Sequence, residues 1–293
     1  MSKPVPRKKI ALVLQGGGVR GAFTAGALDV LLEQGTSFPY VIGTSAGGLN
    51  GVNFIARDIG RSKYVSTELM SDPKFVSFRN FLHHGSFFDF DYLFHTVPQT
   101  VLPFNQDAYD QSDVTFIVAT TRMSDGQAQY FAKGEIDDFY SALAATASLP
   151  LISKPVLVDG GHYLDGGTAA AIPFRKALED GYDKLFVIGT RSEGYRKSNP
   201  KKSSRFIAKL MYRRFPGFLS EYYVQGDRYN RDEEELLRLQ KEGTVFYLRP
   251  DVPPDVKLVE KDKAKLIALY EQGREVMQRE LPALRAFMEV DHE

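Results

Sequence analysis

A serine between glycines stands where an apolar segment gives way to a helix-forming one. The residues are Gly43-Thr44-Ser45-Ala46-Gly47, which follow an apolar run over 38–42 and begin a helix expected over 45–57. Glycines around a serine permit a turn too sharp for larger side chains, and such a turn exposes the hydroxyl between a strand and a helix. Ser45 is therefore the candidate nucleophile, with Gly43 and Gly47 permitting its turn.

A serine hydroxyl is a weak nucleophile and needs a base, but the histidines of this sequence are poorly placed to supply one. In α/β-hydrolases the histidine comes late in the chain, after the acidic residue. Of the five histidines only His292 is late, and it is the penultimate residue, where fraying is expected. The sequence therefore argues against a Ser-His-Asp hydrolase and indicates another base.

Asp165 is the candidate for that base. It follows a short apolar strand expected over 162–164 and precedes Gly166 and Gly167, so its carboxylate should lie at a strand end. A carboxylate with an ordinary pKa of about 4 is a weak base, so a direct Ser-Asp dyad requires partial desolvation of the acid. Taken alone, Asp-Gly-Gly is more typical of a turn, and Asp159-Gly160-Gly161 lies where a hairpin turn is expected.

A glycine-rich loop, Gly16-Gly17-Gly18-Val19-Arg20-Gly21, follows the first expected strand. Gly16, Gly18 and Gly21 match the G-x-G-x-x-G pattern of dinucleotide sites, but no acidic residue ends the second strand as that pattern requires. A nucleotide-binding protein is therefore the weaker alternative. The loop would instead present backbone N–H groups at a helix N-terminus, which suits an oxyanion. Arg20 either adds positive charge there or is a solvated loop charge.

The elements that must position these residues alternate between strands and helices. Continuous apolar runs predict buried parallel strands, and two successive strand–helix units predict right-handed crossovers. Strands are expected over 9–15, 38–42, 114–121, 127–132, 155–158, 162–164, 184–189 and 245–248. Helices are expected over 22–34, 45–57, 137–147, 173–180, 206–215, 220–241 and 262–287, with Pro282 as the expected site of any break in the last.

Residues 60–112 are expected to be helical and irregular, and they are rich in aromatic side chains. The favoured interpretation is a helical subdomain with an aromatic core. The alternative is that some of these rings line an acyl-chain pocket beside Ser45. The aromatic residues are Phe75, Phe78, Phe81, Phe87, Phe88, Phe90, Tyr92 and Phe94.

Length and composition narrow the class of protein. A chain of 293 residues with 43% apolar residues suits one large soluble α/β domain, and a net charge of zero gives no indication of nucleic-acid binding. The absence of cysteine excludes a disulfide scaffold, a thiol nucleophile and a cysteine zinc site. Met1 to Lys9 is basic, and the apolar run after it, Ile10 to Leu14, is too short for a signal peptide or a membrane span. We expect a cytoplasmic protein that is peripheral where it meets a membrane.

One basic segment, residues 196–219, lies in a stretch without acidic residues between Glu193 and Glu221. Apolar residues at helical spacing are interleaved with its cations, as in helices that lie on anionic lipid. The favoured interpretation is an ordinary amphipathic helix packed on the core, with a basic outer face. The cations are Arg196, Lys197, Lys201, Lys202, Arg205, Lys209, Arg213 and Arg214.

The three motifs together resemble the patatin-like phospholipases. That family combines a G-G-G-x-R/K-G loop, a G-x-S-x-G serine and a D-G-G/A aspartate in this order, matched here by Gly16 to Gly21, Gly43 to Gly47 and Asp165 to Gly167. The resemblance covers about residues 9–190, and its overall aspect is that of the bacterial branch. Residues 191–293 match nothing assignable and are expected to be a helical extension with a late strand, packed on the same domain.

The resemblance implies a three-layer α/β/α fold with a mainly parallel sheet, and hydrolysis of lipid acyl esters through an acyl-enzyme without a metal or cofactor. Ser45 would attack the ester carbonyl and Asp165 would act as base. The N–H groups of Gly17 and Gly18, with Arg20, would hold the oxyanion. An acyltransferase using the same acyl-enzyme is an alternative. The sequence indicates neither the head group of the lipid nor the oligomeric state.

Overall fold

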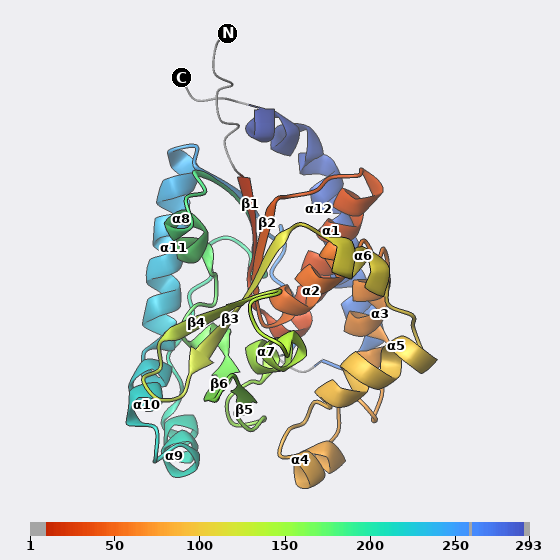
Figure 1. Ribbon diagram of the computed structural model, residues 1–293. Helices are drawn as coiled ribbons and strands as arrows, with labels where there is room; N and C mark the ends of the chain where they lie inside the picture. Colours follow the sequence, from red (N-terminus) through yellow and green to blue (C-terminus); the bar gives the residue numbers. More distant parts are fainter. Residues whose placement is uncertain (1–9, 258–259, 290–293) are drawn as a thin grey trace.

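A mainly parallel sheet lies at the centre of the molecule, with helices on both of its faces (Figure 1). The computed structural model describes residues 10–257 and 260–289, so Met1 to Lys9 and His292 lie outside the described residues. The strand order is β5-β6-β3-β2-β1-β7-β8, and β4 pairs with β3 off this path. The expected α/β fold with a mainly parallel sheet is confirmed.

All eight expected strands are present, each within two residues of its predicted bounds. Strands β3, β2, β1, β7 and β8 pair in parallel, whereas β4 and β6 are antiparallel to β3 and β5 is antiparallel to β6. The strands are β1 (Ile10–Leu14), β2 (Tyr40–Thr44), β3 (Thr115–Arg122), β4 (Ala128–Ala132), β5 (Val156–Val158), β6 (Gly161–Asp165), β7 (Lys184–Ile188) and β8 (Val245–Leu248).

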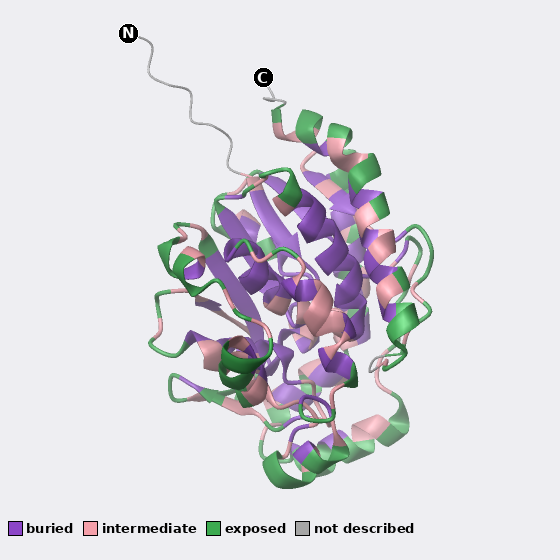
Figure 2. Ribbon diagram, turned by 90° about the vertical axis from the view of Figure 1, so that its right-hand side faces the viewer, coloured by how far each residue is buried: buried purple, intermediate pink, exposed green. Residues whose placement is uncertain are grey.

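The helices form the two outer layers because side chains alternate between the faces of each strand. Ala11 and Val13 of β1 pack in one apolar cluster with α8 and α11, and Leu12 and Leu14 pack in the other with α1, α2, α7 and α12. Figure 2 shows the strands and the helices beside them as the buried interior. The helices are α1 (Gly21–Glu33), α2 (Ala46–Ile55), α3 (Arg61–Thr67), α4 (Phe78–His84), α5 (Val97–Thr100), α6 (Gln106–Gln111), α7 (Phe139–Ala147), α8 (Phe174–Glu179), α9 (Lys202–Met211), α10 (Pro216–Tyr223), α11 (Gln225–Lys241) and α12 (Lys263–Glu289).

Two helix predictions in the C-terminal part of the chain had wrong bounds. The helix expected over 206–215 begins earlier, at Lys202, and ends at Met211, and the helix expected over 220–241 is divided into α10 and α11. Pro216 explains why α9 and α10 are separate, because proline lacks an N–H and is favoured in the first turn of a helix rather than in its interior. In contrast, α12 continues through Pro282 without a break.

Helices α1 and α12 pack at backbone distance through two glycines. A Cβ atom on Gly26 would lie 2.0 Å from the Tyr270 carbonyl oxygen, and one on Gly273 would lie 2.0 Å from the Phe23 carbonyl oxygen. The Tyr270 hydroxyl donates to the buried Asp29 carboxylate at 2.7 Å beside this contact. The long C-terminal helix is therefore fixed to the helix that follows the glycine-rich loop.

The aromatic segment 60–112 forms α3 to α6 and the turns between them. Phe75 and Leu93 are buried in an apolar cluster of this segment, as the favoured interpretation expected. Phe78 differs, because 61% of its surface is exposed. The aromatic side chains are therefore not all core residues.

Candidate active site

Ser45 occupies a strained backbone position between β2 and α2. Its φ of 55° and ψ of −126° are rare for a residue with a side chain and cost on the order of 1–3 kcal/mol. The Ser45 N–H donates to Thr146 Oγ1 at 2.9 Å, which helps to hold the turn. Strain of this kind at a strand-to-helix turn is typical of a nucleophile elbow.

The glycines of the Ser45 motif are required by close packing of backbone. A Cβ atom on Gly43 would lie 2.5 Å from the Gly47 carbonyl carbon. One on Gly47 would lie 2.3 Å from the carbonyl oxygen of Leu14, the last residue of β1. Both contacts are impossible for a real side chain, so the motif lets α2 begin directly against the ends of β1 and β2.

Asp165 comes to the same place because β2 and β6 share one edge of β3. Thr44, the last residue of β2, pairs with Ala119, and Asp165, the last residue of β6, pairs with the next residue, Thr120. The two strands run in opposite directions and therefore end facing each other, next to Ser45. The antiparallel orientation of β6 is thus what brings the carboxylate to the serine.

The alternative aspartate, Asp159, lies in a hairpin turn as expected. It and Gly160 connect β5 to β6, with Val158 paired to Gly161. Both turn residues have a positive φ, 44° and 75°, which fits a tight two-residue hairpin turn. Asp159 does not line the cavity that contains Ser45.

The Asp165 carboxyl group is buried, with an exposed fraction of 2%. Its Oδ1 accepts from the Gly167 N–H at 2.6 Å, and its Oδ2 has no hydrogen-bond partner among the described residues. Burial raises the pKa of Asp165 to about 6, against the opposing effects of the Ser45 hydroxyl, the Gly167 N–H and Lys197. Ser45 therefore lies close enough to Asp165 to lower its pKa, although Asp165 Oδ2 itself has no hydrogen-bond partner among the described residues.

The glycine-rich loop is held by its neighbours but keeps two donors free. The Gly16 N–H donates to the Ala171 carbonyl at 3.0 Å, and Thr190 Oγ1 donates to the Gly16 carbonyl at 3.1 Å. No described residue accepts a hydrogen bond from the N–H groups of Gly17 or Gly18. These groups suit a developing oxyanion, because fixed donors need no reorganisation during reaction.

Arg20 is a buried side chain and not the solvated loop charge that the sequence left open. Only 8% of it is exposed, and its Nε has no hydrogen-bond partner among the described residues. Burial, followed by the nearby Arg191, lowers the pKa of Arg20 to about 10. The side chain therefore remains a cation at neutral pH.

One cavity of about 520 Å³ brings these groups together. Of the residues predicted from the sequence, Gly21, Gly43, Gly47 and Gly166 do not line it. The predicted residues that line it are Gly16, Gly17, Gly18, Arg20, Ser45, Asp165 and Gly167.

The same cavity contains Lys197 and Arg191, which the sequence did not place there. Lys197 was counted among the cations of the surface segment 196–219. Its backbone N–H instead donates to Asn230 Oδ1 at 2.8 Å and its carbonyl accepts from Asn230 Nδ2 at 3.0 Å, which fixes this loop to α11. The only sequence signal was the run of cations without acidic residues, and it does not separate a cavity wall from a surface.

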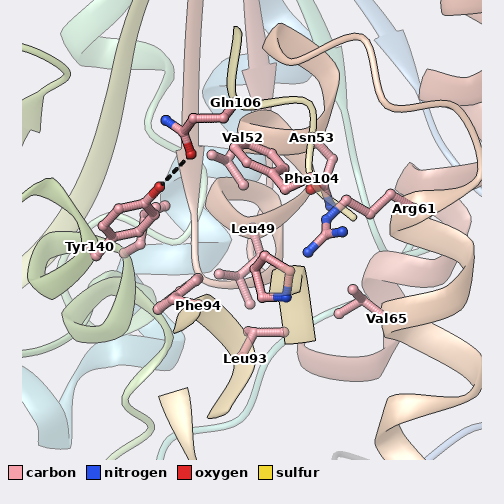
Figure 3. A pocket seen from close by; sticks show the side chains of 12 residues that line it. Leu49, Val52, Asn53, Arg61, Val65, Leu93, Phe94, Phe104, Gln106 and Tyr140 are labelled. Atoms are coloured by element: carbon pink, nitrogen blue, oxygen red, sulfur yellow. Dashed lines mark hydrogen bonds between the residues drawn. The ribbon is translucent and has the colours of Figure 1, made fainter. Parts of the chain in front are cut away.

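A second, smaller cavity with an apolar wall adjoins Ser45 and Gly18. Phe75, Phe88 and Phe90 contribute to its wall, so the interpretation of the aromatic segment as core alone was incomplete. A third cavity shares residues with this one and continues the apolar wall toward Phe94 and Phe104 (Figure 3). The shared residues are Leu49, Asn53 and Val65.

Two further features were searched for in the part of the chain that the structure describes. No group of three or more histidine, aspartate or glutamate side chains there is arranged to hold a metal ion. No helix there is both long and apolar enough to cross a membrane.

Known proteins with similar sequences are informative about the first part of the chain. A family model described as patatin-like phospholipase matches residues 12–178. The uncharacterized protein YjjU of Escherichia coli (strain K12) is 31% identical over 193 residues, which are 64% of this chain and 54% of that protein. Lysophospholipase nte1 of Aspergillus terreus is 26% identical over 202 residues, which are 63% of this chain and 12% of that protein. The chain thus spans about half the length of the first relative and about an eighth of the second.

The last part of the chain has its own match. Residues 215–289 match a family model described as a domain of unknown function. Among solved structures, VipD from Legionella pneumophila resembles this chain with 11% identity and a TM-score of 0.49, over 95% of this chain and 67% of that one.

Proposed function

This chain belongs to the patatin-like phospholipase family, and on that premise we propose that it is a lipid acyl hydrolase with a Ser45–Asp165 dyad. One observation carries the proposal: the strained Ser45, the buried Asp165 carboxyl group and the free N–H groups of Gly17 and Gly18 all border one cavity. A nucleophile, a base and an oxyanion site are the parts that acyl transfer from an ester needs.

The proposed reaction has two steps, formation and hydrolysis of an acyl-serine, and Asp165 acts as the base in both. Asp165 takes the proton of the Ser45 hydroxyl as the serine oxygen attacks the ester carbonyl carbon, and Gly17 and Gly18 donate to the resulting oxyanion. Collapse breaks the bond to the alcohol, which takes the proton from Asp165 and leaves an acyl-serine. Asp165 then takes a proton from a water molecule as the water oxygen attacks this ester, and collapse breaks the bond to Ser45, whose oxygen takes the proton back from Asp165 as the fatty acid is released.

The pKa of about 6 suits Asp165 to this role. The ionised form dominates at neutral pH, yet its proton affinity is higher than that of an ordinary carboxylate, which makes it a better base. The apolar cavity beside Ser45 would receive the acyl chain, because its wall of Phe75, Phe88 and Phe90 favours hydrocarbon.

The proposal is tested by incubating the purified protein with a panel of acyl esters and measuring the released fatty acid. The panel contains phospholipids, lysophospholipids, a triacylglycerol and p-nitrophenyl butyrate. We expect fatty acid from at least one lipid, and addition of glycerol as an acceptor separates hydrolysis from acyl transfer by the products. If no ester is cleaved, the proposed function is wrong, and if acyl-glycerol dominates over fatty acid, the protein is an acyltransferase.

We also propose that the protein meets its substrate at an anionic membrane surface through α9. The expectation that α9 packs its apolar side on the core was wrong: Ala208 is its one buried residue, and Phe206 and Leu210 are 65% and 61% exposed. Exposed apolar side chains beside cations are typical of helices that lie on lipid.

Other elements contribute exposed apolar side chains at the same end of the molecule. Phe78 and Leu82 of α4 are 61% and 69% exposed, and Leu157 of β5 is 59% exposed. Helices α4 and α9 and strand β5 all lie at the lower end of Figure 1, toward which the parallel strands run with their carboxyl ends. The site at those carboxyl ends would therefore face the lipid.

Reversing the charge of three exposed lysines, Lys201→Glu, Lys202→Glu and Lys209→Glu, should weaken binding to anionic vesicles. Each cation near such a surface contributes about 1 kcal/mol, so the partition coefficient should fall by more than tenfold. Sedimentation with vesicles of phosphatidylglycerol and phosphatidylcholine measures it. Arg205 is left unchanged because its guanidinium donates to the Pro200 and Tyr223 carbonyls and so supports the fold.

The control carries the same charge change on α11, at three exposed cations of that helix, Arg231, Arg238 and Lys241. It should bind vesicles like the wild-type protein. Equal binding by the α9 variant and the wild type, or equal losses in both variants, would rule out α9 as the membrane contact.

A further inference from the structure

Among the described residues, three cations and one carboxyl group line the cavity at Ser45. The cations are Arg20, Arg191 and Lys197, and the carboxyl group is that of Asp165. The carboxyl group is needed as the base in the proposed reaction. The cavity wall therefore has an excess of positive charge that the proposed chemistry does not use.

None of the three cations forms an ion pair with a carboxylate within the described ranges 10–257 and 260–289. Lys197 Nζ donates to Gln225 Oε1 at 3.0 Å and to the Gly167 carbonyl at 3.4 Å, both neutral acceptors. The Arg20 Nε has no partner in the same part of the chain. Donors of this kind are available to a ligand.

The cations are close enough to affect one another. Burial lowers the pKa of Lys197 to about 8; Asp165 opposes this, and Arg191, Arg20 and Arg228 lower it further. Arg191 also lowers the pKa of Arg20. Mutual repulsion in a partly desolvated wall is relieved when an anion binds, so the cavity favours a ligand that brings negative charge.

The cavity offers little to a positively charged head group. A quaternary or primary ammonium is bound by carboxylates or by the faces of aromatic rings. Here the Tyr195 ring already carries the Arg191 guanidinium at 4.1 Å, and the Tyr229 ring has Lys197 Nζ at 5.8 Å. The protein's own cations thus lie at two of the three tyrosine rings among the described lining residues and leave only the Tyr222 ring for a choline or ethanolamine group.

We propose that this cavity selects acyl esters whose head group is an anionic phosphate without a balancing ammonium, as in phosphatidate or phosphatidylglycerol, and that Arg20, Arg191 and Lys197 surround that phosphate. The inference rests on the proposed function, since it assigns the head group of the same substrate. Arginine is suited to this task because its planar group binds phosphate oxygens in pairs.

The test uses Ser45→Ala protein, which retains the cavity but lacks the nucleophile, and calorimetric titration with single lipid molecules. Dihexanoyl phosphatidate and dihexanoyl phosphatidylcholine are compared below their critical micelle concentrations, so that no membrane surface contributes. We expect phosphatidate to bind at least about tenfold more tightly, because its phosphate monoester carries roughly −1.5 to −2 charge at pH 7, whereas the ammonium of phosphatidylcholine balances the single negative charge of its phosphate. Equal dissociation constants, or tighter binding of phosphatidylcholine, would overturn the proposal.

Arg191→Gln in the same background tests the residues. The preference for phosphatidate should fall by about tenfold, whereas Arg191→Lys should retain part of it because the charge remains. The matched control is Arg238→Gln, which removes an exposed arginine on α11 that is paired with Glu242 outside the cavity. A preference that survives Arg191→Gln unchanged would show that the cations do not select the phosphate.

A measurement on the wild-type protein needs no variant. Glycerol 3-phosphate should inhibit p-nitrophenyl butyrate hydrolysis competitively and more strongly than phosphocholine, and the reverse order would contradict the proposal. These experiments separate the hydrolase proposal from the phosphate-site proposal. If the wild type cleaves no ester but the Ser45→Ala protein still prefers phosphatidate, the proposed hydrolase activity is wrong and the phosphate site is supported. If the wild type cleaves esters without a head-group preference, the hydrolase activity is supported and the phosphate site is wrong.

Discussion

Asp165→Asn is expected to abolish ester hydrolysis and at the same time to stabilise the fold at neutral pH. Asparagine has nearly the same shape and its Oδ1 can still accept from the Gly167 N–H, so the turn should be preserved. It cannot take the proton of Ser45, and the loss of a general base of this kind costs on the order of 10²–10⁴-fold in rate. The kcat of p-nitrophenyl butyrate hydrolysis measures this effect.

The gain in stability follows from the raised pKa of Asp165. The folded protein holds this group at a pKa of about 6, against an ordinary value of 3.8. At a pH below both values the carboxyl group is neutral in the folded and unfolded states and has no effect. At a pH between the two pKa values the carboxyl group ionises only in the unfolded state, so the free energy of unfolding falls as pH rises. The total decrease is on the order of 3 kcal/mol and is complete above about pH 6. The Asp165→Asn variant avoids this loss, so it should melt higher than the wild type at pH 8 and show little gain near pH 4.

The control for this experiment is Asp159→Asn, which changes the same residue type in the β5–β6 hairpin turn. It should retain activity, because Asp159 lies outside the cavity. The wild-type kcat/KM should also fall as pH drops below about 6, where Asp165 becomes protonated. Loss of activity in Asp159→Asn together with an active Asp165→Asn would show that the wrong aspartate was assigned.

Ser45→Ala should remove the acyl-enzyme altogether. The covalent path is lost with the hydroxyl, and the expected decrease in kcat is on the order of 10³-fold or more. The backbone strain energy at a φ of 55° is similar for alanine and serine, so the substitution should not affect the fold. A fluorophosphonate should add to the wild-type protein at Ser45, seen by peptide mass spectrometry, and should leave Ser45→Ala unlabelled.

A nearby serine provides the comparison. Ser148 is buried, its hydroxyl donates to the Ala144 carbonyl, and it does not line the cavity. Ser148→Ala should therefore be labelled and active. Full activity in Ser45→Ala, or a label attached to another residue in the wild type, would contradict the assignment of the nucleophile.

The strands and the meeting of the motifs could be predicted from sequence because both depend on local patterns. Apolar runs that end in glycine mark the carboxyl ends of buried strands, and Gly16, Ser45 and Asp165 each follow such a run. Parallel strands place their carboxyl ends at one edge of a sheet, so the glycine-rich loop after β1 and the Ser45 turn after β2 are expected to be neighbours. Asp165 joins them through the antiparallel β6, a pairing that local pattern does not specify.

The features that were missed depend on contacts between distant segments. Lys197 and the exposed α9 belong to one run of cations, and the sequence treats them alike. They separate in the structure because Asn230 holds the Lys197 backbone against α11, whereas α9 buries only Ala208 and leaves Phe206 and Leu210 exposed. Pro282 was similarly ambiguous, since whether a helix continues through proline depends on the packing around it.

The glycine contact between α1 and α12 has a consequence for synthesis of the protein. Asp29 and its partner Tyr270 are 241 residues apart, and translation at about 5–20 residues per second separates them by roughly 10–50 s. In the last part of that interval, after residue 165 has been added, the ribosome-bound chain contains Gly16 to Gly21, Ser45 and Asp165, but the side of α1 that Gly273 will contact is uncovered. Helix α1, which follows the glycine-rich loop, is therefore fully buried only after α12 has been synthesised.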